Sequence, residues 1–358
     1  MGRGVQKPHQ LKLGLRTWWR LRRDWELPFS PSYLRRMVLG GAAFTGLREL
    51  QSVLTPGRQT TSLRNSIFIV GHWRSGTTFL HELLSLDDRY GFPPTYACLF
   101  PHCHFFLKRA MLRSSLELKR PMDDMPITPL SPQEDEFALL CLGARSPYEA
   151  LLVPHRLRQA LRLSDVDALT AGEAVQWDKT FVDFLSGVSL SNRRRPLILK
   201  SPPHSYRVSR INRLVPDARF ILIVRDPYAV FESTVRMWSR LLANYTLGPR
   251  LSDEEIRSCV LDERLHFEAK LQAGIAELPA DRIAIIRYEA LVRDPKAELA
   301  KLYAHLKLSD FERVLPALRN YQDQRSGYAP SAASPSPVWR EKIADTWGSI
   351  FDLYEYSR

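Results

Sequence analysis

The 358-residue sequence has no long apolar run and few cysteines. No stretch approaches the roughly eighteen consecutive apolar residues that a membrane-spanning helix needs. The basic N-terminus lacks a continuous apolar segment before a small-residue cleavage site, which argues against a secretory signal peptide. Cys98, Cys103, Cys141 and Cys259 form no Cys-x-x-Cys pair, so they indicate a reduced setting. These absences together predict a cytoplasmic protein.

The sequence also lacks a recognisable metal or nucleic-acid motif. Cys98, His102, Cys103 and His104 lie close together along the chain, but their spacing matches no standard zinc site. We therefore expect these side chains to be packed in the interior and predict that no metal is required. A high isoelectric point alone is weak evidence for nucleic-acid binding, so we predict no nucleic-acid partner.

Positive charge is concentrated at the N-terminus. The formal net charge is +12, and residues 1–65 hold twelve Lys and Arg against three acidic residues, a surplus of nine. We predict that residues 1–62 form a basic helical segment. Its Trp18, Trp19 and Trp25 alternate with basic residues, a pattern that could lie in a membrane interface at the cytoplasmic face. The alternative, which we favour, is a helix docked on the protein's own body with its basic face in water.

A short apolar run at 67–70 leads into a loop with the spacing of a phosphate-binding loop. Gly71 and Gly76 are separated by four residues, and Thr77 and Thr78 then open an apolar helix. Backbone N–H groups in such a loop, at the start of a helix, favour an anion. However, Thr77 stands where a nucleotidase would carry its Lys. The loop therefore predicts a phosphate-type anion site and disfavours ATP or GTP hydrolysis.

Four short, strongly apolar segments, at 67–70, 197–199, 220–224 and 283–286, are each followed by a turn and a helical pattern. This alternation predicts a three-layer α/β/α fold with a central parallel sheet, in one domain covering residues 63–358. Residues 85–190 are mostly helical in pattern and would form an insertion that roofs the sheet on the acceptor side. Residues 325–338 are rich in Pro and small residues and predict a mobile loop, and 339–356 again predict a helix.

Two further motifs follow predicted strands. Arg225 precedes Asp226, a suitable helix N-cap, and Pro227, which fits the first helical position. Ser233 lies about two turns into that helix, so Arg225 and Ser233 could together bind a second phosphate. In the third motif, a strand delivers Lys200 at its end, and a Pro pair then leads to His204.

Together these motifs resemble the P-loop sulfotransferases, and the bacterial branch more closely than the animal cytosolic enzymes. The resemblance spans about residues 65–295 and rests on Gly-His-Trp-Arg-Ser-Gly-Thr-Thr, Leu-Lys-Ser-Pro-Pro-His and Val-Arg-Asp-Pro…Ser. It implies 3′-phosphoadenosine 5′-phosphosulfate (PAPS) as the sulfuryl donor. It also implies that Arg74, Ser75, Gly76, Thr77 and Thr78 cradle the 5′-phosphosulfate, and that Arg225 and Ser233 hold the 3′-phosphate. The C-terminal Arg-Lys-Gly clamp of the family has only a loose counterpart in Arg325-Ser326-Gly327.

The resemblance implies a catalytic role for Lys200. It leaves two candidates for the general base that removes the proton of the acceptor. In the cytosolic branch the catalytic His follows the lysine by two residues, where this chain has Pro202, while His204 lies four residues on. Other branches use a Glu, and Glu134 is the corresponding candidate here. We expect Ser131 and Pro132 to start a helix with Glu134 and Asp135 in its first turn.

The sequence therefore predicts a PAPS-dependent sulfotransferase. Sulfuryl transfer would go to a hydroxyl or amine of an acceptor that is a small molecule, glycan or lipid. Two alternatives remain open at this point. A P-loop kinase-like enzyme would share the loop but would need ATP and Mg²⁺, and a non-catalytic module would bind nucleotide or a membrane without sulfating an acceptor.

Overall fold

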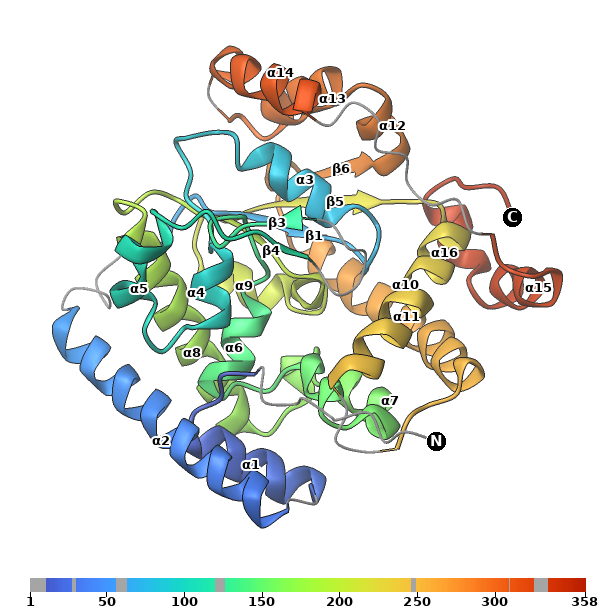
Figure 1. The fold of residues 1–358 in the computed structure, drawn as a ribbon. Coiled ribbons are helices and arrows are strands. Elements are labelled where there is room, and N and C mark those ends of the chain that lie inside the picture. The colour runs from blue at the N-terminus through green and yellow to red at the C-terminus, as the bar shows by residue number, and fades with distance from the viewer. Residues whose placement is uncertain are drawn as a thin grey trace. The chain divides into compact units, whose positions relative to one another are not determined.

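The computed structural model describes residues 11–27, 30–55, 63–119, 126–245, 249–308, 310–324 and 334–358 (Figure 1). The chain divides into two compact units. One unit comprises Met1–Ser62, Pro93–Arg194 and Arg236–Cys259, and the other comprises Leu63–Phe92, Arg195–Val235 and Val260–Arg358. The helices α10 (Pro227–Tyr245) and α11 (Asp253–Ala276) contribute to both units. The division into a segment 1–62 and a single domain 63–358 stays a prediction.

The second unit is built on a parallel four-stranded sheet in the order β4-β1-β5-β6. Its strands are β1 (Ile67–Val70), β4 (Ile198–Lys200), β5 (Arg219–Val224) and β6 (Ile283–Arg287), each within one residue of its predicted limits. Every residue of β1 is buried, as expected for a strand covered on both faces. The predicted α/β fold with a central parallel sheet is confirmed.

Alternation along the strands divides their side chains between two packed faces. Ile67 and Ile69 of β1 share one hydrophobic core with helices α3 (Thr77–Leu84) and α13 (Pro295–His305). On the opposite face, Phe68 stacks on Phe220 with ring centroids 5.6 Å apart. The same unit contains α9 (Val208–Leu214), α12 (Tyr288–Arg293) and α14 (Leu315–Gln324), besides the short 3-10 helices η5 (Pro202–Tyr206), η6 (Ala280–Arg282) and η7 (Phe311–Val314).

The strand order fixes where a ligand should bind. The chain leaves β1 toward β4 on one side, and β5 then pairs with β1 on the other side. In open α/β sheets, ligands bind at the carboxyl ends of the strands where the order reverses. The loops that follow β1 and β5 meet at that point.

Two C-terminal helices cover the start of α10. They are α15 (Pro337–Thr346) and α16 (Gly348–Leu353), drawn beside α10 in Figure 1, and they confirm the helical prediction for 339–356. Trp339 stacks on Phe231 with centroids 5.4 Å apart, and Phe351 lies 4.9 Å from Tyr228. Most of the predicted loop 325–338, including Arg325, Ser326 and Gly327, lies outside the described residues.

The first unit is helical. It contains α1 (Leu15–Trp25), α2 (Pro31–Leu54), α4 (Thr95–Leu99), α5 (His104–Met111), α6 (Glu136–Leu142), α7 (Leu157–Arg162) and α8 (Ala171–Ser191). Short elements join them, namely η2 (Pro147–Leu151), η3 (Pro154–Arg156), η4 (Val166–Ala168) and the antiparallel pair β2 (Leu118–Lys119) and β3 (Pro126–Ile127). The helical character predicted for 85–190 is confirmed, and its role as a roof stays a prediction. In the described parts of the chain, no helix is both long and apolar enough to cross a bilayer.

Candidate active site

The loop after β1 has a backbone shape that depends on glycine. Gly76 has φ +101°, and an added Cβ would lie 2.3 Å from Cδ2 of Tyr288. At Gly71, with φ +146°, a Cβ would lie 2.6 Å from the carbonyl oxygen of Ile223 in β5. Arg74 adopts the left-handed region with φ +68°, which is uncommon for a residue with a side chain. The predicted phosphate loop is therefore a tight turn pressed against β5 and the end of β6.

Hydrogen bonds fix this loop from within and from its neighbours. Ser75 donates from both its N–H (3.1 Å) and its hydroxyl (2.8 Å) to the carbonyl of His72. Thr234 of α10 donates its hydroxyl to the carbonyl of Trp73 at 3.1 Å. The N–H of Gly71 donates to Oγ of Ser205 in η5 at 2.9 Å. The loop is thus tied to the segments that follow β4 and β5.

The loop ends at the N-terminus of α3, where backbone donors remain for an anion. The N–H groups of Thr77 and Thr78 lie in the first helical turn, where no preceding turn supplies an acceptor. No side chain of the described residues caps this N-terminus, because its cap residue is Gly76. These N–H groups and the helix dipole together form an electropositive cradle suited to a phosphate or sulfate.

Three predicted anion-binding side chains lie together beside the loop. Arg74 donates from Nε to Oγ of Ser233 at 3.0 Å, and Arg225 donates from one amino group to the carbonyl of Arg74 at 3.1 Å. Arg74, Arg225 and Ser233 are all partly exposed, so a ligand can reach them. Two guanidinium groups and a hydroxyl at one loop suit a doubly anionic ligand.

The end of β6 positions Arg225, a role that the sequence motifs did not reveal. The Arg225 guanidinium carbon lies 4.4 Å from the ring centroid of Tyr288, a cation–π arrangement. Glu289 accepts a hydrogen bond from the N–H of Asp226 at 3.0 Å. Asp226 caps α10 as predicted, accepting from the N–H of Tyr228 at 3.0 Å. In the sequence, Arg287-Tyr288-Glu289 directly follows the predicted strand 283–286. Only the order of the strands shows that these residues support the loop after β5.

Lys200 and His204 lie in the same unit as the loop and are both deeply buried. Lys200 is the last residue of β4 and pairs in register with Ile69 of β1, two residues before Gly71. Its residue exposure is 2%. His204 is 0% exposed, and its ring lies edge-on to Phe68 with centroids 5.9 Å apart. The structure places Lys200 at the carboxyl edge of the sheet and His204 against the sheet's face.

Glu134 belongs to the other unit, and its local structure differs from the prediction. Helix α6 begins at Glu136, so Glu134 precedes it instead of lying in its first turn. The reason is that Pro132 pairs with Pro94 in an isolated antiparallel bridge, and the N–H of Gln133 donates to the Pro93 carbonyl. These contacts hold the chain extended. Glu134 is buried and accepts a hydrogen bond from the Tyr148 hydroxyl.

A second histidine, His72, lies inside the loop and was not singled out from the sequence. It packs edge-on against Phe267 with ring centroids 5.0 Å apart. Burial, with the nearby Arg264 guanidinium, holds the pKa of His72 well below its usual range, so the ring is neutral. Its Nδ1 lies 3.0 Å from the Trp73 carbonyl and therefore carries the proton. His72 is a neutral support for the loop.

The clustered Cys and His residues of the first unit are packed in its interior, as predicted. His102 donates from Nε2 to the carbonyl of Lys12 at 3.0 Å, and His104 from Nδ1 to that of Pro101 at 3.0 Å. All four cysteines are buried thiols. Within the described residues, no group of three or more His, Cys, Asp or Glu side chains is arranged to hold a metal ion.

Comparison with known proteins shows which family this chain is similar to. The model of the sulfotransferase family matches residues 66–313. The omega-hydroxy-beta-dihydromenaquinone-9 sulfotransferases Stf3 of Mycobacterium bovis (strain ATCC BAA-935 / AF2122/97) and Mycobacterium tuberculosis (strain CDC 1551 / Oshkosh) are each 37% identical over 295 residues. The match covers 82% of this chain and 75% of each relative.

Two solved structures share the fold. Sulfotransferase STF9 from Mycobacterium avium matches with a TM-score of 0.73 and 16% identity, covering 97% of both chains. Sulfotransferase STF1 from Mycobacterium tuberculosis H37Rv matches with a TM-score of 0.63 and 17% identity, covering 92% of this chain and 91% of that one. The resemblance found in the sequence motifs is confirmed.

Proposed function

This chain belongs to the sulfotransferase family and is an enzyme that transfers a sulfuryl group, and we propose that its donor is PAPS, bound at the loop after β1. The proposal is based on the cluster of Arg74, Arg225 and Ser233, which lies beside the N-terminus of α3, a helix end without a side-chain cap. A kinase-like reading is disfavoured by family membership and by Thr77 in place of the loop lysine.

The residues present fit a donor with two separate anionic groups. The loop residues Arg74, Ser75, Gly76, Thr77 and Thr78 would hold the 5′-phosphosulfate, because the loop leads into the N-terminus of α3, which has no side-chain cap and where backbone N–H groups favour an anion. Arg225 and Ser233 would hold the 3′-phosphate. The Tyr288 ring fixes one face of Arg225, which leaves its planar donor edge to bind phosphate oxygens.

The proposed chemistry is an in-line transfer. The acceptor oxygen forms a bond to sulfur while the bond between sulfur and the bridging oxygen of the donor breaks, and the acceptor proton passes to a base. PAPS supplies the activated sulfuryl group, and the electron pair of the broken bond stays on the bridging phosphate oxygen. Lys200 at the end of β4 would stabilise the negative charge that develops there. Catalysis then depends mainly on positioning and charge stabilisation.

Two residues remain candidates for the base, and a pair of variants separates them. His204 is fully buried, whereas Glu134 has a residue exposure of 8% and holds a hydrogen bond from Tyr148. Replacing the true base with a neutral amide side chain, by Glu134→Gln or His204→Asn, should lower the activity of the enzyme mainly through kcat. The residue whose variant retains most of its kcat, with unchanged stability, is the one that is not the base.

The acceptor is proposed to be a hydroxyl on a small, lipid-like molecule. Support comes from the 37% identical relatives, whose names describe an omega-hydroxy menaquinone derivative as their acceptor. The first unit carries aromatic side chains in the segment predicted to lie on the acceptor side, including Tyr96, Phe100 and Phe105. Screening should therefore begin with long-chain alcohols that carry a terminal hydroxyl.

Calorimetric titration with 3′,5′-adenosine bisphosphate tests the donor site directly. We expect micromolar binding by the intact protein, at least tenfold weaker binding by Arg225→Ala, and no comparable binding of ATP with Mg²⁺. Arg313→Ala is the matched control, because Arg313 is a surface residue that pairs with Asp88. A preference for ATP, or equal losses in both variants, would overturn the proposed donor site.

A further inference from the structure

Helix α2 exposes an unusual amount of apolar surface. Of its 24 residues, only Met37, Gly41 and Gln51 are buried. Large aliphatic side chains on it are exposed, namely Val38 (37%), Leu39 (65%), Leu50 (50%), Val53 (75%) and Leu54 (58%). No charged residue occurs between 37 and 47. Exposed aliphatic groups clustered on one helix mark an interaction surface, whereas single ones are ordinary.

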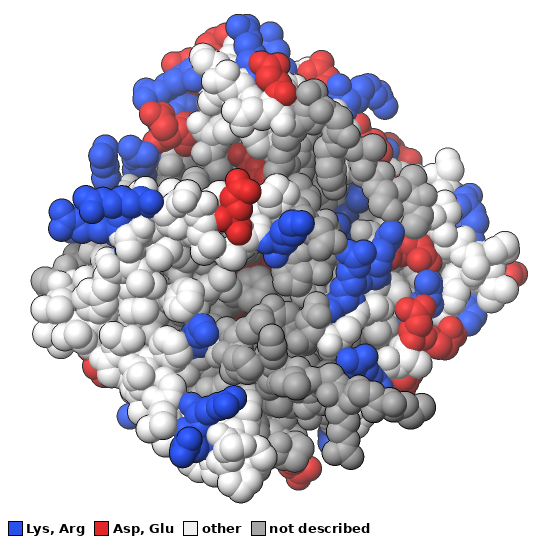
Figure 2. All heavy atoms as spheres, viewed as in Figure 1, with Lys and Arg blue, Asp and Glu red and all other residues white. Residues whose placement is uncertain are grey.

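These side chains share one face of the helix. Leu39, Leu50 and Val53 are spaced by eleven and three residues, which places them within about 60° of one another at about 100° per residue, with the small Ala42, Ala43 and Gly46 in the same sector. We call this surface the outer face of α2. In Figure 2 the lower left part of the molecule, where Figure 1 shows α2, is mostly uncharged, with separate patches of Lys and Arg.

The opposite face of α2 is fastened to the rest of the first unit. Gln51 donates from Nε2 to the Pro101 carbonyl and accepts from the N–H of Phe105, each at 3.1 Å. Arg48 donates to the Leu142 carbonyl at 3.1 Å. The outer face therefore points away from the segment that α2 covers.

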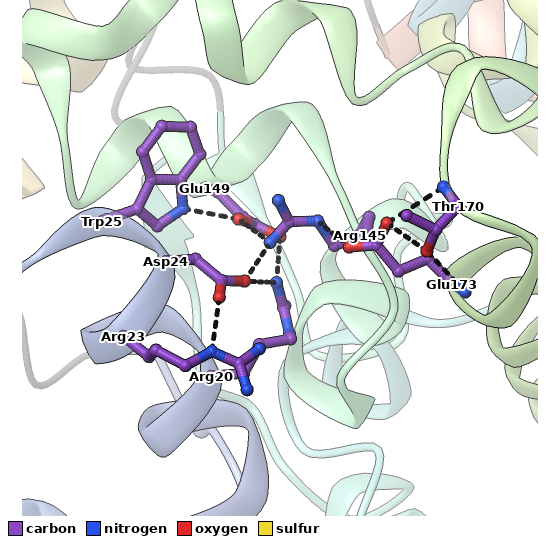
Figure 3. A network of polar contacts seen from close by, with 8 residues as sticks. All are labelled: Arg20, Arg23, Asp24, Trp25, Arg145, Glu149, Thr170 and Glu173. Atoms are coloured by element: carbon purple, nitrogen blue, oxygen red, sulfur yellow. Dashed lines mark hydrogen bonds and ion pairs between the residues drawn. The ribbon is translucent and has the colours of Figure 1, made fainter.

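Helix α1 is docked on the same unit, so the favoured alternative for the N-terminal tryptophans is confirmed for Trp18 and Trp25. Figure 3 shows the buried Glu149 carboxylate at the centre of this contact. It accepts from Arg20 (2.9 Å), from the indole N–H of Trp25 (2.7 Å) and from Arg145 (3.1 Å). Trp19 is different. It is 50% exposed, and the Arg22 guanidinium carbon lies 5.5 Å from its ring centroid.

We propose that the outer face of α2 docks on the surface of an anionic lipid bilayer, with α2 lying in the plane of the interface. Arg35 and Arg36 are exposed on this helix, and residues 11–27 and 30–55 carry eight Lys and Arg against three acidic residues, so the charge is complementary to anionic headgroups. Aliphatic side chains with flanking arginines are common in helices that lie in a membrane interface.

Charge also disfavours a second copy of this chain as the partner that covers the outer face of α2. The segment around this face carries a net positive charge, so two copies brought together would repel each other. A bilayer with anionic lipid removes that repulsion. Docking would bring the enzyme to the bilayer, in which a lipid-like acceptor is dissolved. Only this last point rests on the proposed function.

Sedimentation of the full chain with lipid vesicles tests the inference. We expect binding to vesicles of phosphatidylcholine with one quarter phosphatidylglycerol, and weaker binding to phosphatidylcholine alone. The variant Leu39→Ser/Leu50→Ser/Val53→Ser should bind the anionic vesicles about tenfold more weakly or worse. The control variant Val175→Ser/Ile285→Ser/Val338→Ser should bind as the parent does. Its three aliphatic side chains are comparably exposed, at 67%, 60% and 63%.

A charge variant and two further measurements complete the test. Arg35→Glu/Arg36→Glu should weaken binding to anionic vesicles by at least tenfold and reduce its dependence on salt. Binding of 3′,5′-adenosine bisphosphate should be the same in all these variants, so a failed donor site and a failed docking surface give different results. Absence of vesicle binding, or equal binding by the parent and the α2 variant, would overturn the inference. Concentration-dependent dimerisation lost in the α2 variant would assign the face to self-association instead.

Discussion

Substituting Gly76 by alanine is a sharp test of the loop geometry. Gly76 has φ +101°, and a Cβ would lie 2.3 Å and 2.8 Å from Cδ2 and Cε2 of Tyr288. The same ring supports Arg225, whose guanidinium carbon lies 4.4 Å from the ring centroid. One methyl group therefore strains the backbone and displaces the side chain that positions an anion-binding arginine.

The expected cost follows from two contributions. A residue with a Cβ in the left-handed region costs about 1–2 kcal/mol relative to the right-handed one. Displacing the Tyr288 ring forfeits the cation–π contact, which is worth about 0.5–2 kcal/mol. A total of about 1.5–4 kcal/mol corresponds to roughly 10- to 1000-fold in an equilibrium constant. If the loop relaxes, this factor appears as weaker binding of 3′,5′-adenosine bisphosphate, because only the native loop conformation binds.

If the loop does not relax, the same cost lowers the free energy of unfolding. Calorimetry with the bisphosphate and urea denaturation should therefore be run together on Gly76→Ala. Gly172→Ala is the matched control, because nothing lies within 4 Å of an added Cβ at Gly172. The added change Tyr288→Leu should relieve the steric part of the strain and leave the backbone part. Combined losses below about 0.5 kcal/mol in Gly76→Ala would refute the reasoning, since that is within the range of neutral surface changes.

Three further predictions concern other buried groups. Ser205→Ala removes the acceptor for the N–H of Gly71 and should lower the free energy of unfolding by about 1–3 kcal/mol in urea, whereas no loss would show that the bond at 2.9 Å is dispensable. Lys200→Ala should lower kcat by roughly 10²- to 10³-fold while leaving bisphosphate affinity within about threefold; equal losses would remove its assigned role. Burial lowers the pKa of His102 to about 4, below the unfolded value near 6.5, so stability present above pH 6.5 is lost as the pH falls toward 4. Between pH 6.5 and pH 5 the free energy of unfolding of His102→Gln should therefore fall by about 1.5 kcal/mol less than that of the parent, and parallel pH curves for the two proteins would contradict this.

The parts of the site that are local in sequence were predicted well. Strand β1, the turn from Gly71 to Gly76 and the Asp226 cap of α10 each depend on residues within a few positions of one another. Their signals are backbone signals, because glycine permits a left-handed turn and aspartate accepts from the first N–H groups of a helix. Such signals need no knowledge of the fold.

The residues whose supporting roles the sequence did not predict act across the sheet. Ser205, Tyr288 and Glu289 contact the loop or the start of α10 only because β4 and β5 flank β1 and β6 follows β5. That order is set by tertiary pairing, so no local pattern identifies these residues as supports. The start of α6 was placed too early for the same reason, since the bridge between Pro132 and Pro94 joins residues 38 positions apart.

The C-terminal residues also support the proposed donor site. Glu289, which accepts from the N–H of Asp226, accepts in addition from the Tyr356 hydroxyl at 2.8 Å. Burial and this carboxylate raise the pKa of Tyr356, so the phenol keeps its proton and stays a donor at neutral pH. Arg287 donates to the Tyr354 carbonyl at 2.6 Å. The last residues therefore fasten the end of β6 to the start of α10, and the position of Arg225 depends on segments more than a hundred residues away in sequence, although its chemistry depends on one motif.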